Sequence, residues 1–277
     1  MKALDIKEKI TQLEVETIAL PQVDCPVIHR FGPGIYIREV TLPAGALVIG
    51  HKHRFEHTNI MLKGKMTLLD EDGTTRRLEA PFIYVGNPGR KIAYIFEEVV
   101  WQNIYATDET DVEKLEEMFL DKNELWIAHK GKSDSIARLL HEGDREDYLE
   151  AIKDYGFTPE EVRKISENES DLLRIPFGGY KVKVGDSPIE GKGLFATADI
   201  QEGEVIMPAR VGNSRTIAGR YTNHAQEPNA RMILLKNNDI DLVATRNISG
   251  CKGGMDGEEI TIDYRQALSL SHRKMEA

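Results

Sequence analysis

The stretch RYTNHAQEPN at residues 220–229, together with GEEITIDY at residues 257–264, decides the fold of the C-terminal part of the chain. Both lie in a region of short predicted strands that begins after residue 177 and ends near residue 264. Taken alone, the polar pair Asn223-His224 would be interpreted as a turn. That interpretation weakens once Pro228-Asn229 and the closing segment are counted with it, because an ordinary turn does not explain all three.

Outside this region the hydrophobic pattern changes several times along the chain. Apolar residues near the N-terminus have helical spacing until Pro21 interrupts them. Short apolar runs then alternate with Gly, Pro and Asp-Gly turns, which is typical of a sandwich or barrel. The predicted segments are an N-terminal arm at 1–24, a β-barrel at 25–106, a helical connector at 107–175, a second β-rich domain at 176–268 and a tail at 269–277.

The connector carries the start signals of several helices. Thr110 and Glu113 are spaced as a capping box, which predicts a helix directly after them. Another helix is predicted from Asp144 to Tyr155, and the next begins at Thr158 with Pro159 in its first turn. The expected fold class is therefore mainly β with a helical connector, an α+β chain.

Composition limits the classes of partner. The formal charge of −10 over 277 residues argues against broad attraction to nucleic acid or an anionic membrane and suits a cationic protein. No apolar stretch reaches the ~20 residues that span a bilayer, and no secretory signal is recognised at the N-terminus. Cys25 and Cys251 fall in different predicted domains and are expected to be reduced thiols in a cytoplasmic protein.

Three histidines gather in the predicted barrel. His51 and His53 lie two apart in a predicted strand, so both should point to one sheet face, and His57 follows after three residues. With its flanking glycines, this stretch resembles the first motif of the cupin family, double-stranded β-helix barrels that often hold a divalent metal. The family usually has a carboxylate where His57 stands, and Lys91 or Ile92 occupies the place of its fourth ligand, a histidine.

The histidine motif supports two interpretations. Three imidazoles can bind Zn²⁺, Fe²⁺ or Mn²⁺ with open coordination positions, which suits Lewis-acid or dioxygenase chemistry. Alternatively, the barrel is a retained scaffold in which these histidines are polar residues near its mouth. Some cupin modules mediate oligomerisation, so the resemblance also implies a homo-oligomer. Trp101 is expected to be a core residue.

The C-terminal segments resemble the signature of SET-domain methyltransferases. GKGLFAT at residues 191–197 is similar to the opening strands of that family, residues 220–229 to its Arg-Phe-x-Asn-His motif with the following Pro-Asn, and residues 257–264 to its closing motif. Together the three are more specific than any one of them, and they cover about residues 177–266. The resemblance implies a knotted β-fold in which the C-terminal segment threads a loop formed by the Asn-His segment.

The resemblance also implies a cofactor and a reaction. The cofactor is S-adenosylmethionine, and the substrate is the lysine amine of a protein. Tyr264 is implied to lie where the amine meets the methyl group; the alternative is an ordinary buried tyrosine with a satisfied hydroxyl. Methyl transfer is an in-line displacement, so holding the two reactants in a dry channel supplies most of the catalysis. The implied cofactor-binding residues are Lys192, Gly193, Leu194, Asn223 and His224.

Several departures from the SET pattern concern the substrate. Ala225 and Gln226 replace the usual Ser and Cys. Sixteen residues separate Ile206 from Asn223, which leaves almost no room for the inserted subdomain that commonly shapes the substrate groove. The cysteine-rich segment that often follows the closing tyrosine is also missing. Substrate selection is therefore expected from the connector helices, the cupin-like barrel or a second subunit.

Three functional hypotheses follow. The leading one is a cytoplasmic S-adenosylmethionine-dependent protein-lysine N-methyltransferase whose cupin-like domain mediates oligomerisation or presents the substrate. The overall arrangement also resembles bacteriophage-encoded proteins, so the second is a non-enzymatic assembly or virion component that uses both folds as interaction modules. The third is a metal-dependent cupin enzyme with an accessory SET-like domain. For a phage-encoded protein the expected location is the host cytoplasm or the virion.

Overall fold

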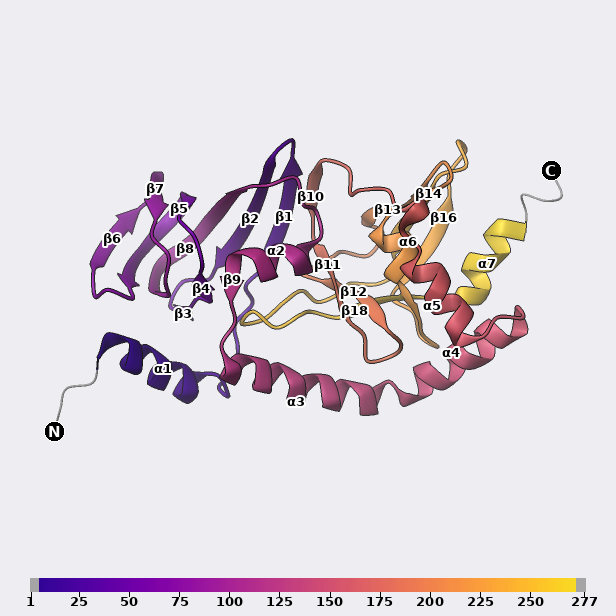
Figure 1. Cartoon of the computed structure of the whole chain (residues 1–277), viewed down its shortest axis with the longest axis horizontal. Helices are drawn as coiled ribbons and strands as arrows, with labels where there is room; N and C mark the ends of the chain where they lie inside the picture. Colours follow the sequence, from indigo (N-terminus) through magenta and orange to yellow (C-terminus); the bar gives the residue numbers. More distant parts are fainter. Residues whose placement is uncertain (1–4, 273–277) are drawn as a thin grey trace. The chain divides into compact units, whose positions relative to one another are not determined.

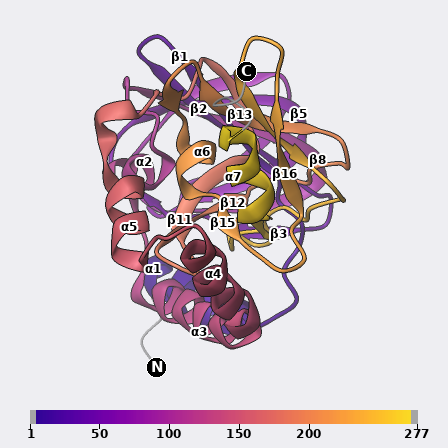
Figure 2. The same ribbon diagram turned by 90° about the vertical axis from the view of Figure 1, so that its right-hand side faces the viewer.

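The computed structural model describes residues 5–272 and divides the chain into two units (Figure 1, Figure 2). Unit 1 comprises the residues up to 132, with 177–179 and 251–255. Unit 2 comprises residues 133–176, 180–250 and those from 256 onward. The division falls inside a single helix, α3 (Glu124–Leu140).

Unit 1 is built on an eight-stranded sheet of order β10-β1-β2-β8-β5-β6, in which β3 also pairs with β8 and β7 with β5. Neighbours such as β1 and β2, or β5 and β8, run antiparallel. Its strands are β1 (Val27–Gly32), β2 (Ile35–Leu42), β3 (Leu47–Ile49), β5 (His57–Asp70), β6 (Thr75–Glu79), β7 (Phe82–Gly86), β8 (Lys91–Ala106) and β10 (Gly178–Tyr180).

Two of these strands are longer than the short strands predicted from the sequence. β5 has 14 residues and β8 has 16, and the register between them shifts between Met61 and Met66. Gly64 lies in that irregular segment with a φ of +93°, and an added Cβ would lie 2.1 Å from the carbonyl oxygen of Glu98. Glycine is therefore required there. The sequence indicates a turn at Gly64, but in the structure Gly64 lies at a bulge within strand β5.

The core of unit 1 includes side chains from β5 and β8 on both sides of this irregular segment. Met61 and Met66 on β5 join Ile95, Val99 and Trp101 on β8 in one buried cluster. Because side chains alternate along a strand, each half of β5 and of β8 contributes every second residue to it. The strand-rich fold predicted for residues 25–106 is confirmed, and Trp101, 7% exposed, is a core residue as predicted.

Two helices of unit 1 begin at aspartate caps. α1 (Ile6–Thr17) begins after Asp5 in a capping box and accounts for the helical spacing of the arm. α2 (Val112–Phe119) begins after Asp111, whose carboxylate accepts hydrogen bonds from the backbone N–H groups of Glu113 and Lys114. The capping box predicted at Thr110 is wrong, because Asp111 already satisfies these donors. After α2, β9 (Leu120–Asp121) pairs with β4 (Lys52–His53).

Two helices that lie wholly in unit 2 precede its strands. α4 (Glu142–Asp154) matches the predicted helix, and α5 (Pro159–Glu167) begins with the predicted capping box of Thr158. A 3₁₀ turn, η1 (Glu169–Asp171), follows. α4 contacts α5, α7 (Tyr264–His272) and β15 (Asn223–His224), as Figure 2 illustrates. Within residues 5–272, no helix combines the length and apolar character needed to cross a membrane.

The strands of unit 2 form two four-stranded sheets, of order β11-β12-β18-β15 and β14-β13-β17-β16. α7 includes the first residues of the predicted tail, and 273–277 of that tail, like 1–4 of the arm, lie outside the described residues. The remaining elements are β11 (Val182–Asp186), β12 (Lys192–Ala196), β13 (Val205–Val211), β14 (Ser214–Arg215), α6 (Ile217–Tyr221), β16 (Ala230–Leu234), β17 (Ile240–Ala244) and β18 (Glu259–Ile262).

Candidate functional site

The short strand β15 brings together the segments that the sequence singled out. Asn223 and His224 pair in parallel with Thr261 and Ile262 of β18. The Asn223 side chain also reaches the glycine-rich turn: its Nδ2 donates to the carbonyl oxygens of Glu190 at 3.0 Å and Lys192 at 3.1 Å. One amide thus ties the turn to the Asn-His segment.

Glu259 is a buried acid that binds the Asn223 side chain. Its carboxylate accepts from Asn223 Nδ2 at 2.9 Å and from the Ser187 hydroxyl at 2.8 and 2.9 Å. Burial raises the pKa of Glu259 to about 7, although the bonds from Asn223 and Ser187 oppose the shift. A Cβ at Gly193 would lie 2.3 Å from Glu259 Oε1, so the glycine at 193 leaves space for this carboxylate.

The His224 ring, 1% exposed, connects the closing motif to helix α4. The backbone N–H of Tyr264 donates to His224 Nδ1 at 3.1 Å. Nδ1 is therefore an acceptor, and the ring proton lies on Nε2, which donates to Asp147 Oδ2 at 2.7 Å. The same carboxylate binds Arg265, with Nη2 at 2.9 Å and Nη1 at 3.2 Å. The pKa of Asp147 is held below its usual range by Arg265 first and also by His224.

Tyr264 lies at the start of α7 with its hydroxyl directed at the main chain. The hydroxyl donates to the carbonyl oxygen of Thr222 at 3.3 Å, and burial raises its pKa, so it stays protonated. Its ring is 5.5 Å from the His224 ring and meets the Tyr148 ring edge-on at 6.0 Å. Both the predicted role and the ordinary buried tyrosine remain compatible with this geometry.

The remaining residues predicted to bind cofactor differ in exposure. The Leu194 side chain is fully buried, so it belongs to the core and only its main chain is available. Lys192 forms an ion pair with Asp186 at 3.0 Å. Gly191 is exposed with a φ of +55°, and an added Cβ would meet no atom within 4 Å, so the turn is open on that side.

Sequence reasoning missed the contribution of α4. Asp144 accepts from the backbone N–H of Gln226 at 2.9 Å, and Tyr148 and Ile152 form a buried cluster with Ile189. The available signal was the helical spacing of residues 144, 147, 148, 151 and 152, which places them on one face.

Arg220, the first residue of the stretch at 220–229, connects helix α6 to the 3₁₀ turn η1. Its guanidinium is fully buried, and Nη1 lies 2.7 Å from Asp171 Oδ1. Arg215 binds the other oxygen of Asp171 at 2.6 Å, and together these cations lower the pKa of Asp171. This network is a structural anchor for the Asn-His segment.

The three histidines of the cupin-like motif do not contact the same rings. His53 stacks on His57 at 4.1 Å, whereas His51 meets Trp126 edge-on at 4.9 Å. The predicted strand over both His51 and His53 is wrong, because β4 contains only residues 52 and 53, so alternation along one strand does not relate the two side chains. Burial lowers the pKa of His51 to about 4 and that of His53 to about 2, so both rings are neutral.

Stacked rings do not direct their nitrogens at one point, so this geometry does not fit a three-histidine metal centre. His53 Nδ1 is 3.0 Å from the Tyr105 hydroxyl, and His57 Nδ1 is 3.1 Å from the Phe55 carbonyl oxygen. Within residues 5–272, no group of three or more His, Cys, Asp or Glu side chains is arranged to hold a metal ion. Metal binding here stays a prediction from the sequence.

The two cysteines lie in one unit, contrary to the prediction. Cys25 N donates to the Cys251 carbonyl oxygen at 3.3 Å, and the Cys251 thiol donates to the Cys25 carbonyl oxygen at 3.0 Å. The neighbouring bridge of Asp24 with Lys252 is antiparallel, so the two cysteines are directly opposite each other. Residues 251–255 belong to unit 1 although the chain on either side of them belongs to unit 2. Such a segment exchange cannot be read from sequence order.

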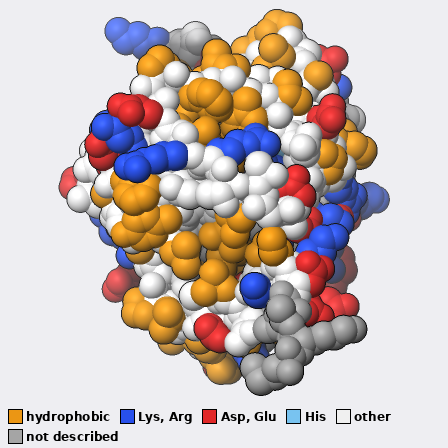
Figure 3. Space-filling model, turned by 90° about the vertical axis from the view of Figure 1, so that its left-hand side faces the viewer, with side chains coloured by type: hydrophobic (Ala, Val, Ile, Leu, Met, Phe, Trp, Pro, Cys, Tyr) orange, Lys and Arg blue, Asp and Glu red, His pale blue; other side chains and the backbone are white. Residues whose placement is uncertain are grey.

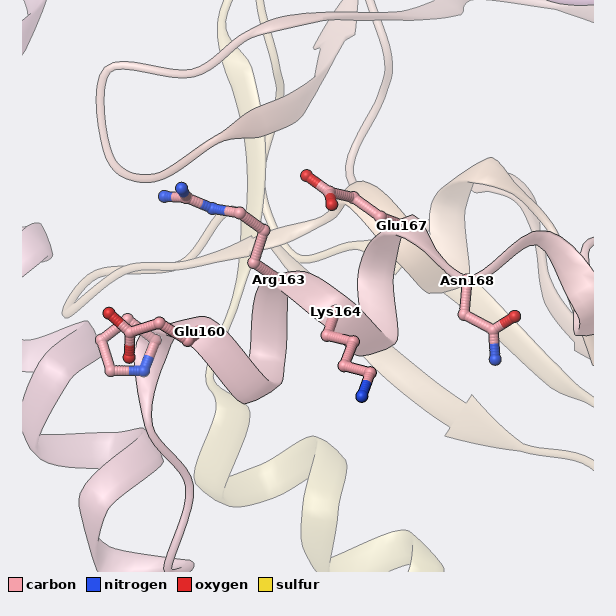
Figure 4. A pocket seen from close by; sticks show the side chains of 6 residues that line it. Glu160, Arg163, Lys164, Glu167 and Asn168 are labelled. Carbon is pink, nitrogen blue, oxygen red and sulfur yellow. The ribbon is translucent and has the colours of Figure 1, made fainter.

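A shallow hollow of about 450 Å³ lies along α5 (Figure 4). Its labelled side chains, among them Glu160, Arg163 and Lys164, all come from this helix and the residue after it. A ligand site usually combines groups from several elements. The hollow is therefore not a candidate site.

Comparisons with known proteins find fold similarity for the N-terminal third. No family model and no curated protein matches the chain. It is similar to an RmlC-like cupin protein with a double-stranded β-helix fold from Methanocaldococcus jannaschii, at 18% identity over 34% of this chain and 87% of that chain, with a TM-score of 0.27. A cupin domain from Bordetella pertussis has 17% identity over 32% of this chain and 99% of that chain, with a TM-score of 0.27. The SET-like and phage-like interpretations gain no support from the comparisons.

Proposed function

We propose that unit 2 transfers a methyl group from S-adenosylmethionine to the lysine amine of a protein substrate. The observation that carries the proposal is the convergence of three segments far apart in the sequence. Asn223 binds the carbonyl of Lys192, and its strand pairs with β18. The backbone of Tyr264 binds the neighbouring His224 ring. These are the segments whose order and composition resemble the SET signature.

The groups around the glycine-rich turn fit such a cofactor. The open side of Gly191 gives a ligand access to the main chain of Lys192 and Gly193. The Asn223 amide, bound to two carbonyls of the turn, supports the shape of this main chain. The main chain of His224 would complete the contacts, because its ring is already occupied by Asp147 and Tyr264.

Tyr264 would orient the amine. When bound, the cofactor would supply an electrophilic methyl group on a sulfonium; the nitrogen of the neutral amine would attack this methyl carbon in line, so that the N–C bond forms while the C–S bond breaks and the sulfur leaves as a neutral thioether. Because the Tyr264 hydroxyl gives its hydrogen to the Thr222 carbonyl, the lone pairs of its oxygen are available to accept an N–H of the amine. An amine held in this way directs its own lone pair along a fixed line. The raised pKa keeps the phenol neutral, so it does not stabilise an ammonium ion at this point.

The experiment measures cofactor binding and transfer separately. Calorimetric titration with S-adenosylmethionine is expected to show binding to the wild type and a loss of at least about tenfold in Asn223→Ala, which loosens the turn. Tyr264→Phe should keep binding and lose transfer of labelled methyl to lysine-rich protein. Tyr180→Phe is the matched control, since the Tyr180 hydroxyl also donates to a backbone carbonyl, that of Pro176 at 2.8 Å. Absence of wild-type binding at millimolar cofactor would refute the proposal.

We also propose that unit 1 mediates self-assembly, as in the second hypothesis. Figure 3 shows hydrophobic side chains gathered on the face that it presents. On β7, Ile83 is 65% exposed and Val85 is 62% exposed, which is unusual for large apolar residues on one strand. Sedimentation of the wild type should show a defined oligomer that Ile83→Ser with Val85→Ser dissociates. A monomer at high concentration contradicts this role.

A further inference from the structure

Helix α4 lies outside residues 177–266, to which the SET resemblance is confined, yet it contacts all three converging segments. Asp144 binds the backbone of Gln226 after the Asn-His pair. Tyr148 packs against Tyr264 and, with Ile189, borders the glycine-rich turn. Asp147 contacts His224 and Arg265. The connector therefore supplies one side of the candidate site.

A chain of hydrogen bonds runs from the Asp147 carboxylate through the His224 ring to the backbone N–H of Tyr264. Its carboxylate accepts from His224 Nε2 at 2.7 Å, and His224 Nδ1 accepts from Tyr264 N at 3.1 Å. A charged acceptor at Nε2 holds the ring plane and makes Nδ1 a stronger acceptor. The bidentate pair with Arg265 fixes the residue after Tyr264 as well.

The contacts around Asp147 distinguish it from the other acids nearby. Its side chain is 18% exposed and the His224 ring is 1% exposed, so water does not replace their bond readily. The other charged groups nearby are occupied by their own contacts: Asp144 with Gln226 and His141, and Asp154 at 3.9 Å from Arg265. Asp147 is the acid whose carboxylate accepts hydrogen bonds from the side chains of both His224 and Arg265. Asp263 lies farther from the His224 ring, at 3.9 Å from Nδ1, and accepts from the backbone N–H of Arg265.

We propose that Asp147 is a positioning residue, which acts through His224 and Arg265 to hold the main chain of Tyr264 in place for methyl transfer. The catalytic part of this inference rests on the proposed function. The positional part concerns the backbone at Tyr264 and stands independently of it.

The test compares Asp147→Ala and Asp147→Asn with Glu150→Gln, an exposed control on the same helix. Hydrogen exchange of the Tyr264 amide should accelerate at least about tenfold in Asp147→Ala, as expected for loss of a charge-assisted bond. Asp147→Asn should have a smaller effect, because its carbonyl still accepts from Nε2. The amide of Leu242, in the strand between β13 and β16, reports whether unit 2 stays folded.

In a transfer assay, kcat should fall at least about tenfold in Asp147→Ala. The dissociation constant of S-adenosylmethionine should change by less than about threefold, because the glycine-rich turn keeps its contacts. Unchanged Tyr264 exchange in Asp147→Ala overturns the inference, and faster exchange with unchanged kcat overturns its catalytic part. If Asp147→Ala unfolds and Leu242 exchange also rises, the Asn variant decides by the same two criteria. A wild type without transfer refutes the proposed function, while the exchange result still tests the positioning.

Discussion

Glu259 offers the sharpest test of the site, because its buried carboxyl links stability to pH. Its folded-state pKa of about 7 lies above an ordinary value near 4.5. Between these values the folded chain binds more protons than the unfolded chain, so the free energy of unfolding falls as pH rises through this window. The shift corresponds to about 3 kcal/mol. The contribution is fully present below pH 4.5 and lost above about pH 7.

Glu259→Gln should remove this dependence and keep the packing. The amide oxygen of glutamine can still accept from Asn223 and Ser187, which bind the carboxylate in the wild type. Relative to the wild type, the variant should therefore gain about 3 kcal/mol between pH 4.5 and pH 8, most of it between pH 5 and pH 8. Other titrating groups are common to both proteins and cancel in the difference.

Urea unfolding followed by two probes measures this effect. Both tryptophans, Trp101 and Trp126, lie in unit 1, so fluorescence reports unit 1 and far-UV circular dichroism reports both units. Glu258→Gln is the matched control. Burial opposes the shift, but hydrogen bonds from Arg246 and the backbone of Ser249 hold the pKa of Glu258 below its usual range. It is thus ionised at both pH 5 and pH 8. A Glu259→Gln difference that stays constant within about 0.5 kcal/mol from pH 5 to pH 8 would refute the reasoning.

Three further predictions concern unit 1. Asp111→Ala should destabilise it by about 1 kcal/mol in fluorescence-detected urea unfolding, and Thr110→Ala should not, because Asp111 caps α2. Gly64→Ala should cost more than about 2 kcal/mol by the same measurement, since its Cβ would clash with the Glu98 carbonyl; a near-neutral result contradicts the bulge. Mild oxidation of the folded protein should join Cys25 and Cys251 within one chain, detected by peptide mass mapping, and their failure to join would argue against the facing register.

Local signals predicted local structure well. The start of α5 at Thr158 follows from a capping box that acts within four residues, and the α4 boundaries follow from its apolar spacing. The same reasoning failed where the deciding contact is distant. Gly64 has the composition of a turn, and only its pairing partner across the sheet makes it a bulge in β5. His51 and His53 were assigned one face because the length of β4, set by pairing with β9, is not visible in the sequence.

The candidate site was predicted only in part, because several of its contacts join residues that are distant in the sequence. The convergence of Asn223 and Tyr264 was expected from a resemblance that carries long-range information, and propensity alone does not supply it. Asp147 lies 77 residues from His224, outside any recognised motif, and its carboxylate is indistinguishable in the sequence from the other acids of α4. Its role depends on which face of the helix meets β15. That choice is made by the buried cluster around Tyr148.

The distribution of charge in unit 2 bears on how a lysine could react there, given the proposed function. The chain carries a net charge of −10, which attracts a cationic protein at long range. At the site, however, two of the acids are paired with cations: Asp147 with Arg265, and Glu190 with Arg163 and with Arg145 at 3.5 Å. Unpaired carboxylates beside an ammonium would stabilise its proton and prevent attack. Because Asp147 and Glu190 each have a cation of their own, these two acids add little to the pKa of a bound amine. The overall charge then favours the arrival of the substrate, and the paired site permits the loss of its proton.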